Sequence, residues 1–148
     1  MTKILFICHG NICRSPMAEF IMKKIASKKA LDVYIESAAT STDEIGNHVY
    51  GKAAAVLRGH GIDGFDGKTA RQVRKADYEN FDLLIIMDSE NEFGIRRIIE
   101  SDPEGKIKKL LSFAGDDGDI DDPWYTGEFE RAYEEIERGC LSLAETLE

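Results

Sequence analysis

The sequence predicts an α/β fold in which helices cover both faces of an open four-stranded parallel sheet. Apolar runs of strand length alternate along the chain with segments that carry apolar residues at helical spacing. The strand-like runs are continuously apolar, which is typical of parallel strands buried on both faces. No linker, repeat or low-complexity tract interrupts the 148 residues, so we expect a single domain over residues 1–148.

The N-terminal half is predicted to contain two strands, each followed by a helix. Residues 3–8 (KILFIC) form the first strand, and residues 15–30 form a helix with Pro16 at an opening position. Residues 33–39 (VYIESAA) form the second strand, and residues 47–61 form the second helix.

The C-terminal half continues the alternation and ends in an amphipathic helix. Ser89 precedes a periodic segment and Glu92 follows three residues later, a pattern that predicts a capping box. The predicted elements are, in order, a strand at 81–88, a helix at 89–100, a short strand at 106–114, a polar loop at 115–127 and a helix at 128–148.

The composition is that of an ordinary globular protein with an acidic surface. Asp and Glu number 28 against 19 Lys and Arg, which gives a net charge of −9. This excess argues against nonspecific binding to nucleic acid or to an anionic membrane, because both need basic patches. The N-terminal apolar run is too short for a signal sequence or a membrane span, so we expect a cytoplasmic protein with Cys8, Cys13 and Cys140 as thiols.

The stretch CHGNICRS, residues 8–15, follows the first predicted strand and leads into the first helix. Ligands of open parallel sheets bind at the carboxyl ends of strands, so a site is expected at Cys8. Gly10 and Asn11 tolerate positive φ, which a chain needs to curl around an anion. Backbone N–H groups at the helix N-terminus and the Arg14 guanidinium would then hold a phosphate, which predicts a phosphate-binding loop after the first strand.

The same loop is suited to a nucleophilic sulfur. Thiols ionise more readily at helix N-termini and beside Arg, so Cys8 would be a thiolate without a basic partner. The Ser15 hydroxyl would donate to that sulfur and help it leave later.

Other roles for the cysteines are open at this point. Cys8 alone could be a buried strand residue, and Cys13 alone a small packing residue. Zinc could use Cys8, Cys13 and His9, with His48 or His60, but the chain has no second CxxC or HxxxH pair. We therefore expect no metal and no cofactor.

The segment FICHGNICRSPMAE (6–19) resembles the signature of the low-molecular-weight protein tyrosine phosphatases. The resemblance covers essentially the whole chain, because further segments of the family pattern recur in order. These are ESAAT (36–40), HGIDGFDGKTARQ (60–72), FDLLIIMD (81–88) and DPWY (122–125).

The resemblance implies a protein-tyrosine phosphatase that acts on phosphotyrosine-containing proteins and on small aryl phosphates. Cys8 would form a cysteinyl-phosphate intermediate, Arg14 would bind the phosphoryl oxygens, and Asp122 would be the general acid. Ser15 would stabilise the thiolate, and Asn11 and Ser37 would support the loop by hydrogen bonds. The remaining residues of the phosphate-binding loop would be His9, Gly10, Ile12 and Cys13.

The loop that carries Asp122 is rich in aspartate, and the run from Asp116 to Asp122 as a whole is expected to be a solvated loop or a weak cation site. It lacks the terminal glutamate of a calcium loop. Trp124 and Tyr125 would form one wall of the pocket around a substrate ring, the alternative being core packing.

The sequence departs from the family pattern around the expected pocket. Ala39 stands where glycine is usual, Asp43 lies near the position of a pocket-wall aromatic, and Lys68 replaces a histidine that braces the loop. Asp43 and Glu44 at the rim would disfavour acidic residues that flank the phosphorylated residue of a peptide.

Three other functions compete with phosphotyrosine hydrolysis. A protein-arginine phosphatase of the same fold would carry Thr at the position of Ile12, and the apolar Ile12 favours a ring. An arsenate reductase would need a relay of further cysteines, whereas Cys140 is alone on a helix face. A phosphate-binding module without catalysis would need neither Cys8 nor Asp122.

The second cysteine of the loop has a predicted redox role. A curled loop would bring Cys13 within disulfide reach of Cys8, and the resemblance implies the same pairing. Cys8 would be the first site that peroxide oxidises, and Cys13 would trap it as a disulfide before irreversible oxidation. The alternative is that Cys13 only packs beneath the loop.

Overall fold

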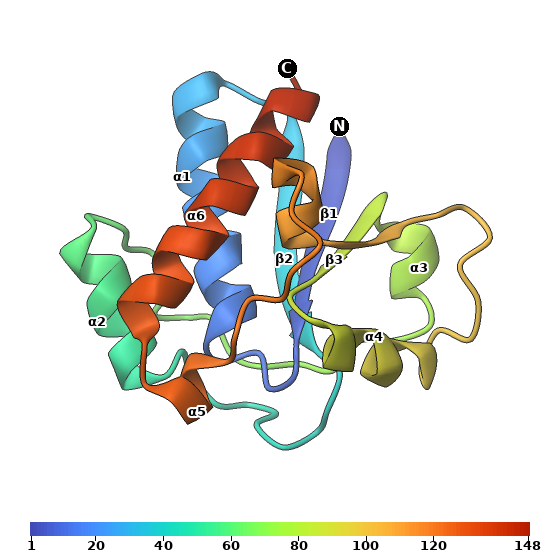
Figure 1. The fold of residues 1–148 in the computed structure, drawn as a ribbon, viewed down its shortest axis with the longest axis horizontal. Coiled ribbons are helices and arrows are strands. Elements are labelled where there is room, and N and C mark those ends of the chain that lie inside the picture. Colours follow the sequence, from blue (N-terminus) through green and yellow to red (C-terminus); the bar gives the residue numbers. More distant parts are fainter.

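The computed structural model describes residues 1–148 and has the α/β architecture expected from the sequence (Figure 1). Its strands are β1 (Thr2–Cys8), β2 (Val33–Ala39), β3 (Leu83–Ile86) and β4 (Ile107–Lys109). They form one sheet in the order β2-β1-β3-β4, and each neighbouring pair is parallel. The predicted four-stranded parallel sheet is confirmed.

Helices cover both faces of this sheet, because alternate residues of each strand point to opposite faces. From β1, Ile4 and Phe6 join a core cluster with α1 and α6, while Leu5 and Ile7 join a second cluster with α4. Figure 1 shows α1, α2 and α6 on one side of the sheet and α3 and α4 on the other. The helices are α1 (Arg14–Lys29), α2 (Gly51–Gly59), α3 (Asp77–Asn80), α4 (Ser89–Arg96), α5 (Pro123–Thr126) and α6 (Phe129–Thr146).

The strand order determines where the site lies. The chain leaves β1, forms β2 on one side of it, and then returns to form β3 on the other side. The loops after β1 and β3 therefore diverge at the carboxyl ends of the strands and leave a crevice there. Cys8, the last residue of β1, opens onto this crevice.

The start of α4 differs from the prediction. Asp88, not Ser89, is the N-cap, because the Asn91 N–H donates to Asp88 Oδ1 at 2.7 Å and the Asp88 N–H donates to Asn91 Oδ1 at 3.2 Å. The Ser89 N–H and hydroxyl instead donate to Asp119 Oδ1, at 3.1 and 3.3 Å. The predicted capping box at Ser89 and Glu92 is therefore wrong, and α4 ends at Arg96 rather than at residue 100.

The predicted fourth strand is also too long. Only Ile107–Lys109 pairs with β3, and Leu110–Ala114 forms a 3₁₀ helix that buries Leu110 and Leu111 against α6. This close approach depends on Gly139 of α6, where a Cβ would lie 2.5 Å from Leu110 Cγ. Tertiary packing has thus overridden a local strand pattern.

Two further boundaries moved inward, and two short helices were not predicted. The helix predicted from residue 47 begins at Gly51, because His48 pairs with Thr69 in an isolated antiparallel bridge. The third strand is restricted to Leu83–Ile86. The four-residue helix α3 lies between the predicted elements, and α5 lies within the predicted polar loop.

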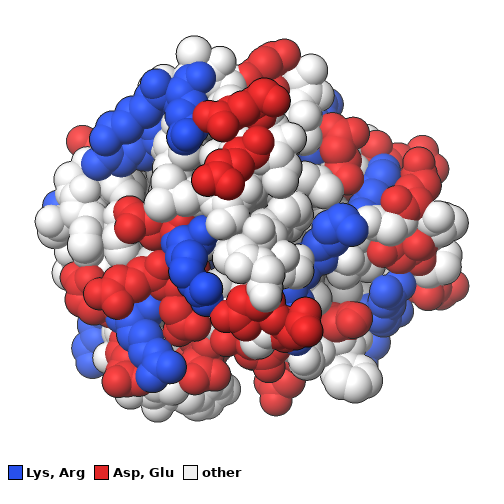
Figure 2. All heavy atoms as spheres, turned by 45° about the horizontal axis from the view of Figure 1, so that its top comes forward, with Lys and Arg blue, Asp and Glu red and all other residues white.

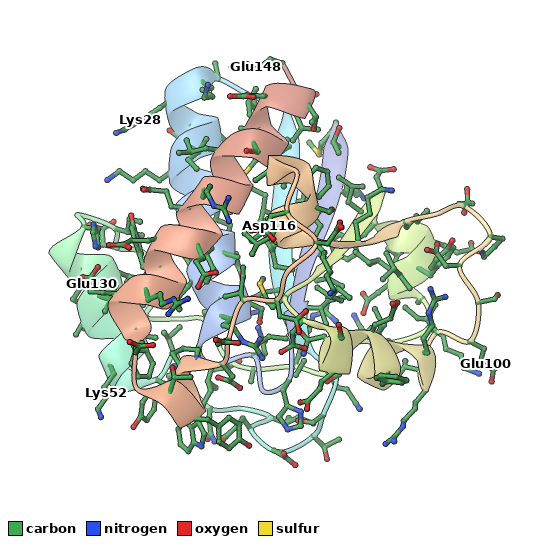
Figure 3. The ribbon with its side chains drawn as sticks, viewed as in Figure 1. Lys28, Lys52, Glu100, Asp116, Glu130 and Glu148 are labelled. Atoms are coloured by element: carbon green, nitrogen blue, oxygen red, sulfur yellow. The ribbon has the colours of Figure 1, made fainter.

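Acidic and basic side chains are interspersed over the surface, with acidic ones more frequent on the face in Figure 2. The aspartates of the 115–122 loop are exposed or partly exposed, as expected for a solvated loop, and two of them also form ion pairs at the surface. Asp116, labelled in Figure 3, accepts from Arg138 of α6 at 2.7 Å, and Asp119 pairs with Lys109 at 2.8 Å. No helix has the length and apolar character needed to cross a membrane.

Candidate active site

The loop from Cys8 to Ser15, here called the 8–15 loop, curls between β1 and α1. Asn11 has a φ of 61°, in the left-handed region, and so turns the chain back on itself. Gly10 does not have a positive φ, and a Cβ there would make an ordinary contact, 3.4 Å from Glu44 Cγ. Cys13 is the N-cap of α1, which directs the helix N-terminus into the loop.

The Cys8 sulfur lies on the floor of this loop and is surrounded by hydrogen-bond donors. The backbone N–H groups of Asn11 and Ser15 donate to Sγ at 3.3 and 3.4 Å. The Ser15 hydroxyl oxygen lies 3.0 Å from Sγ. Donors that converge on one sulfur stabilise its thiolate.

The direction of the neighbouring hydrogen bonds identifies the Ser15 hydroxyl as the donor to the sulfur. The Asn11 Nδ2 amino group donates to Ser15 Oγ at 2.8 Å and to Ser37 Oγ at 2.9 Å. The only other acceptor for the Ser15 hydroxyl proton is the Ala38 carbonyl, at 3.5 Å. Since Sγ is nearer, Ser15 donates to Cys8.

This chain of bonds ends on a buried carboxylate. Ser37 Oγ donates to Glu19 Oε1 at 2.6 Å, so its oxygen is free to accept from Asn11. Lys23 and Lys68 lie 2.6 and 3.6 Å from the Glu19 carboxylate, and Lys68 also donates to the Ser37 carbonyl at 2.7 Å. Burial lowers the pKa of Lys68, although Glu19 opposes the change. Lys68 thus supports the loop indirectly, through Ser37 and Glu19.

A second anchor fixes the Asn11 side chain from the other end. The Arg71 backbone N–H donates to Asn11 Oδ1 at 3.2 Å. The Arg71 guanidinium forks onto the buried Asp77 carboxylate at 3.0 and 3.2 Å. The roles of Glu19, Arg71 and Asp77 were not predicted from the sequence. Buried charged residues are usually paired, but the burial of Asp77 and its pairing with Arg71 are visible only in the structure.

Arg14 begins α1 and is almost fully buried, at 2% exposure. Its Nη1 donates to Asp88 Oδ2 at 2.5 Å and to the Ile120 carbonyl at 2.7 Å, and its Nη2 lies 3.4 Å from Asp122 Oδ2. Burial opposes the guanidinium charge, but Cys8, Asp88 and Asp122 outweigh it and raise the pKa of Arg14. Arg14 is therefore a permanently charged group fixed beside Cys8.

Asp88 was not recognised as a site residue from the sequence. It follows β3 and so reaches the same sheet edge as Cys8, because the carboxyl ends of parallel strands meet there. The sequence does place Asp88 at the end of a predicted buried strand, and this position could have identified it as a site residue.

Asp122 is placed by the start of α5. It is the N-cap residue, its Oδ1 accepts the Trp124 N–H at 3.1 Å, and Pro123 occupies the first helical turn. The loop before it is fastened by the Ile120 N–H, which donates to the Met87 carbonyl at 2.9 Å. The Asp122 carboxylate is therefore held in place beside Arg14 and at the pocket.

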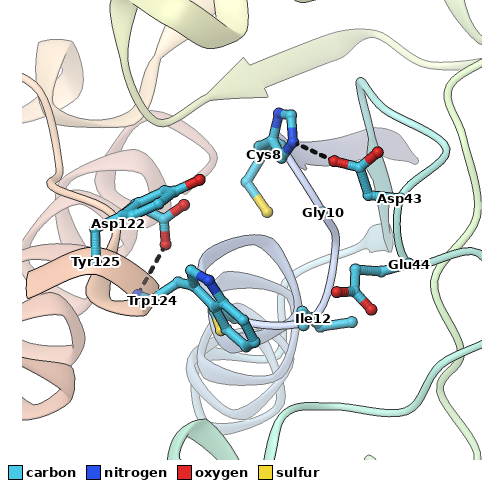
Figure 4. A pocket seen from close by; sticks show the side chains of 10 residues that line it. Cys8, Gly10, Ile12, Asp43, Glu44, Asp122, Trp124 and Tyr125 are labelled. Carbon is cyan, nitrogen blue, oxygen red and sulfur yellow. Dashed lines mark hydrogen bonds and ion pairs between the residues drawn. The ribbon is translucent and has the colours of Figure 1, made fainter. Parts of the chain in front are cut away.

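A pocket opens above the 8–15 loop (Figure 4). In Figure 4 the Cys8 sulfur points into it, with Asp122 and Trp124 on one side and Glu44 on the other. Its lining residues are Cys8, His9, Gly10, Ile12, Cys13, Asp43, Glu44, Asp122, Trp124 and Tyr125.

The aromatic wall stands at the surface rather than in the core. Trp124 is 50% exposed and Tyr125 is 81% exposed, so the core-packing alternative for this pair is wrong. Tyr50, which the sequence analysis missed, supports Trp124 in an edge-to-face contact with 4.8 Å between ring centroids. Trp124 and Tyr125 therefore line the pocket above Cys8 as exposed aromatic surfaces.

The other candidate residues are placed as follows. Cys13 is buried beside the pocket, and burial together with the negative charge of Cys8 and Asp122 raises its pKa. Cys140 is fully buried, with its sulfur 3.9 Å from the Ala18 carbonyl, and burial raises its pKa. All three cysteines are free.

The candidate zinc ligands do not come together. No three His, Cys, Asp or Glu side chains are grouped so as to hold a metal ion. His9 pairs with Asp43 at 2.9 Å, and His60 stacks on Tyr133 with 3.8 Å between ring centroids.

Comparisons with known proteins identify a family to which this chain is similar over almost its whole length. Residues 3–148 match the family model "Low molecular weight phosphotyrosine protein phosphatase". The low molecular weight protein-tyrosine-phosphatase YfkJ of Bacillus subtilis is 40% identical, covering 100% of this chain and 97% of the relative. The low molecular weight phosphotyrosine protein phosphatase of Gallus gallus is 38% identical, covering 96% and 93%.

Solved structures show the same fold. The crystal structure of YfkJ superposes with a TM-score of 0.93 at 41% identity, covering 99% of this chain and 94% of that one. A Drosophila arginine phosphatase superposes with a TM-score of 0.88 at 30% identity, covering 98% and 97%.

Proposed function

The chain belongs to the low molecular weight phosphotyrosine protein phosphatase family, and from this premise we propose that Cys8, Arg14 and Asp122 carry out the hydrolysis. The chain is a protein-tyrosine phosphatase. The observation that carries the residue assignment is the convergence of three hydrogen-bond donors on the buried Cys8 sulfur, beneath an open pocket. We take residues 1–148 as one catalytic domain.

The first step is in-line attack on phosphorus. The Cys8 thiolate forms the S–P bond while the bond from phosphorus to the tyrosyl oxygen breaks. Asp122 gives its proton to that oxygen, so the leaving group departs as a neutral phenol rather than as a phenolate. The position of Asp122 at the pocket, with its backbone fixed by α5, supports this role.

Charge on the phosphoryl group is met by Arg14 and by the loop backbone. The guanidinium binds two phosphoryl oxygens, and the remaining contacts come from N–H groups that point into the curl. The residues proposed for these contacts are His9, Gly10, Asn11, Ile12, Cys13 and Ser15, and Ser37 braces them through Asn11.

The second step releases phosphate. Asp122, now ionised, takes a proton from a water whose oxygen attacks phosphorus, and the S–P bond breaks. The electron pair returns to Cys8 as a thiolate. The Ser15 hydroxyl, which donates to this sulfur at 3.0 Å, stabilises the charge as it forms.

The pocket favours a substrate side chain with a ring. The sulfur lies on the floor of a pocket walled by Trp124, with the apolar Ile12 at its side. A phosphotyrosine ring would contact Trp124 and Ile12 while its phosphoryl group lies at Cys8, contacts that the phosphoserine side chain, which has no ring, does not make. The fold alone does not select phosphotyrosine, because the Drosophila structure of the same fold is an arginine phosphatase.

Turnover of three peptides that share their flanking residues tests the substrate. We expect kcat/KM for the phosphotyrosine peptide to exceed that for the phosphoarginine and phosphoserine peptides by at least about tenfold. The reason is ring contact with Trp124 and Ile12. Faster release of phosphate from the phosphoarginine peptide than from the phosphotyrosine peptide would identify the enzyme as a protein-arginine phosphatase instead.

Cys13 is proposed to protect Cys8 from oxidation. Peroxide oxidises the Cys8 thiolate to a sulfenic acid, and the Cys13 thiol displaces water from it to form a disulfide. The two buried cysteines line the same pocket, which supports the pairing. The raised pKa of Cys13 keeps its thiol protonated. The disulfide therefore forms as the Cys13 sulfur attacks the Cys8 sulfur, and the Cys13 proton joins the departing hydroxide as water.

Peroxide treatment followed by dithiothreitol measures this role. The wild type should regain most of its activity, because the disulfide is reducible. Cys13→Ser should lose activity to the same dose and recover poorly, while Cys140→Ser should recover like the wild type. Full recovery of Cys13→Ser would leave packing as the only role of Cys13.

We also propose that the enzyme acts in the cytoplasm on phosphotyrosine proteins, with neither nucleic acid nor membrane as a partner. Three free cysteines and a reaction that needs reduced Cys8 support a reducing compartment. The net charge of −9 disfavours nucleic acid and anionic lipid.

A further inference from the structure

Three carboxylates line the pocket, and they differ in the side chains that contact them. Asp43 lies 2.9 Å from His9 Nε2, and Asp122 lies 3.4 Å from Arg14 Nη2. Glu44 forms no ion pair; its only hydrogen-bond partner is the Asn47 side-chain amide, which donates to Oε2 at 2.6 Å. Glu44 therefore presents an unneutralised negative charge to whatever enters the pocket.

The position of this charge is fixed by the backbone around it. The Asn47 N–H donates to the Glu44 carbonyl at 2.9 Å, and the Gly46 N–H donates to the Ala70 carbonyl at 2.9 Å. The Ser41 N–H and hydroxyl both donate to the His9 carbonyl, at 3.1 and 2.9 Å, and so tie this segment to the 8–15 loop.

The Glu44 side chain is also held against the 8–15 loop. Its Cγ passes over Gly10, close enough that a Cβ at Gly10 would lie 3.4 Å away. The negative charge of Glu44 also acts on that loop. It helps to raise the pKa of Cys13, although burial, Cys8 and Asp122 have larger effects. In Figure 4 the carboxylate faces the pocket across from Trp124.

An anionic side chain at this point opposes the reaction unless the substrate compensates for it. The phosphoryl group that must reach Cys8 is itself negative, so Glu44 repels it. A cationic side chain next to the phosphotyrosine would pair with Glu44 and offset that repulsion. The ring would occupy the pocket beside Trp124, and its neighbours in the peptide would pass over the rim where Glu44 stands.

We propose that Glu44 is a specificity-determining residue that selects phosphotyrosine segments with Lys or Arg beside the phosphotyrosine. The proposal rests on the proposed function, because it takes the pocket above Cys8 as the phosphotyrosine site. It goes beyond the exclusion of acidic neighbours, since it names the group on the enzyme and the basic partner that it binds. Asp43 contributes less, because its side chain is exposed and solvent screens its charge, whereas Glu44 is partly buried.

Three phosphotyrosine peptides that differ only in the two residues flanking the phosphotyrosine provide the test. The flanks are Lys, Gln or Glu. For the wild type at low ionic strength, we expect kcat/KM in the order Lys, Gln, Glu, with about two- to fivefold between successive peptides. The order should collapse in about 1 M salt, where charges more than about 3 Å apart are screened.

Variants at Glu44 identify the source of the preference. Glu44→Gln keeps the shape and the acceptor for Asn47, and should reduce the Lys-to-Glu ratio to near one. Glu44→Lys should invert it. Glu145→Gln is the matched control, because it makes the same change in net charge at an exposed residue at the far end of α6 from α5 (Figure 1). It should keep the wild-type ratio.

The readout is a ratio of two substrates on one enzyme sample, so a partly unfolded variant does not change it. Equal turnover of the three peptides by the wild type, or an unchanged ratio in Glu44→Gln, would overturn the role of Glu44 and leave the phosphatase assignment intact. Failure of the wild type to hydrolyse any of the three peptides would overturn the proposed function, and the proposal for Glu44 with it.

Discussion

Cys8→Ser should lower turnover of phosphotyrosine and of aryl phosphates by about 10⁴-fold or more, the scale seen when a catalytic nucleophile is removed. The sulfur receives two backbone N–H bonds and the Ser15 hydroxyl, an arrangement that stabilises a thiolate. A serine hydroxyl in the same place remains protonated and does not attack phosphorus. Steady-state release of phosphate measures the effect.

The same variant should still bind phosphate or vanadate, since Arg14 and the loop backbone are unchanged. An increase in the melting temperature of the variant on addition of vanadate measures this binding and shows that the variant is folded. Loss of turnover together with retained binding separates this enzyme from a phosphate-binding module, which would not depend on Cys8 for any reaction. Substantial turnover by Cys8→Ser would rule out covalent catalysis by this residue.

Asp122→Asn should slow phosphotyrosine hydrolysis by about 10²–10⁴-fold, the usual contribution of a general acid. Asn still accepts the Trp124 N–H and caps α5, so the loss is one of chemistry rather than of loop structure. The decrease should be smaller for an aryl phosphate with an acidic leaving group, because that group departs without a proton. A series of aryl phosphates that differ in leaving-group acidity measures the dependence.

Asp121→Asn is the matched control for Asp122. Asp121 is the preceding residue and carries the same charge, but it does not line the pocket above Cys8. Its replacement should change kcat little. A larger effect at Asp121 than at Asp122 would move the general acid by one residue.

The fold and the centre of the site were within reach of the sequence, for physical reasons. The apolar run at residues 3–8 defines β1 closely and the run at 81–88 places β3, because parallel strands buried on both faces tolerate few polar residues. The 8–15 loop was recognised because a strand, a curl with Asn11 and a helix N-terminus occur within a few consecutive residues. All of that information is local.

The residues that brace the site were not predictable in the same way. Asp88 and the pair of Arg71 and Asp77 reach the loop from segments far apart in the sequence, and Glu19, although it follows the loop in α1, acts through Ser37 of β2. Each has the appearance of an ordinary surface charge in the sequence, and its burial follows only from the strand order. The capping of α4 was missed because Asp88 and Ser89 are both good N-cap residues, and tertiary contact of Ser89 with Asp119 decides between them.

The central claim is that Cys8 carries the phosphoryl group between two steps. Rapid acid quenching of the Asp122→Asn variant with an aryl phosphate that has an acidic leaving group, followed by mass spectrometry of its peptides, tests it directly. The slowed second step should let the intermediate accumulate, with one phosphate on the peptide that contains Cys8, absent in the Cys8→Ser form. Phosphate on any other residue, or turnover with no phosphorylated peptide at any time, would contradict the account.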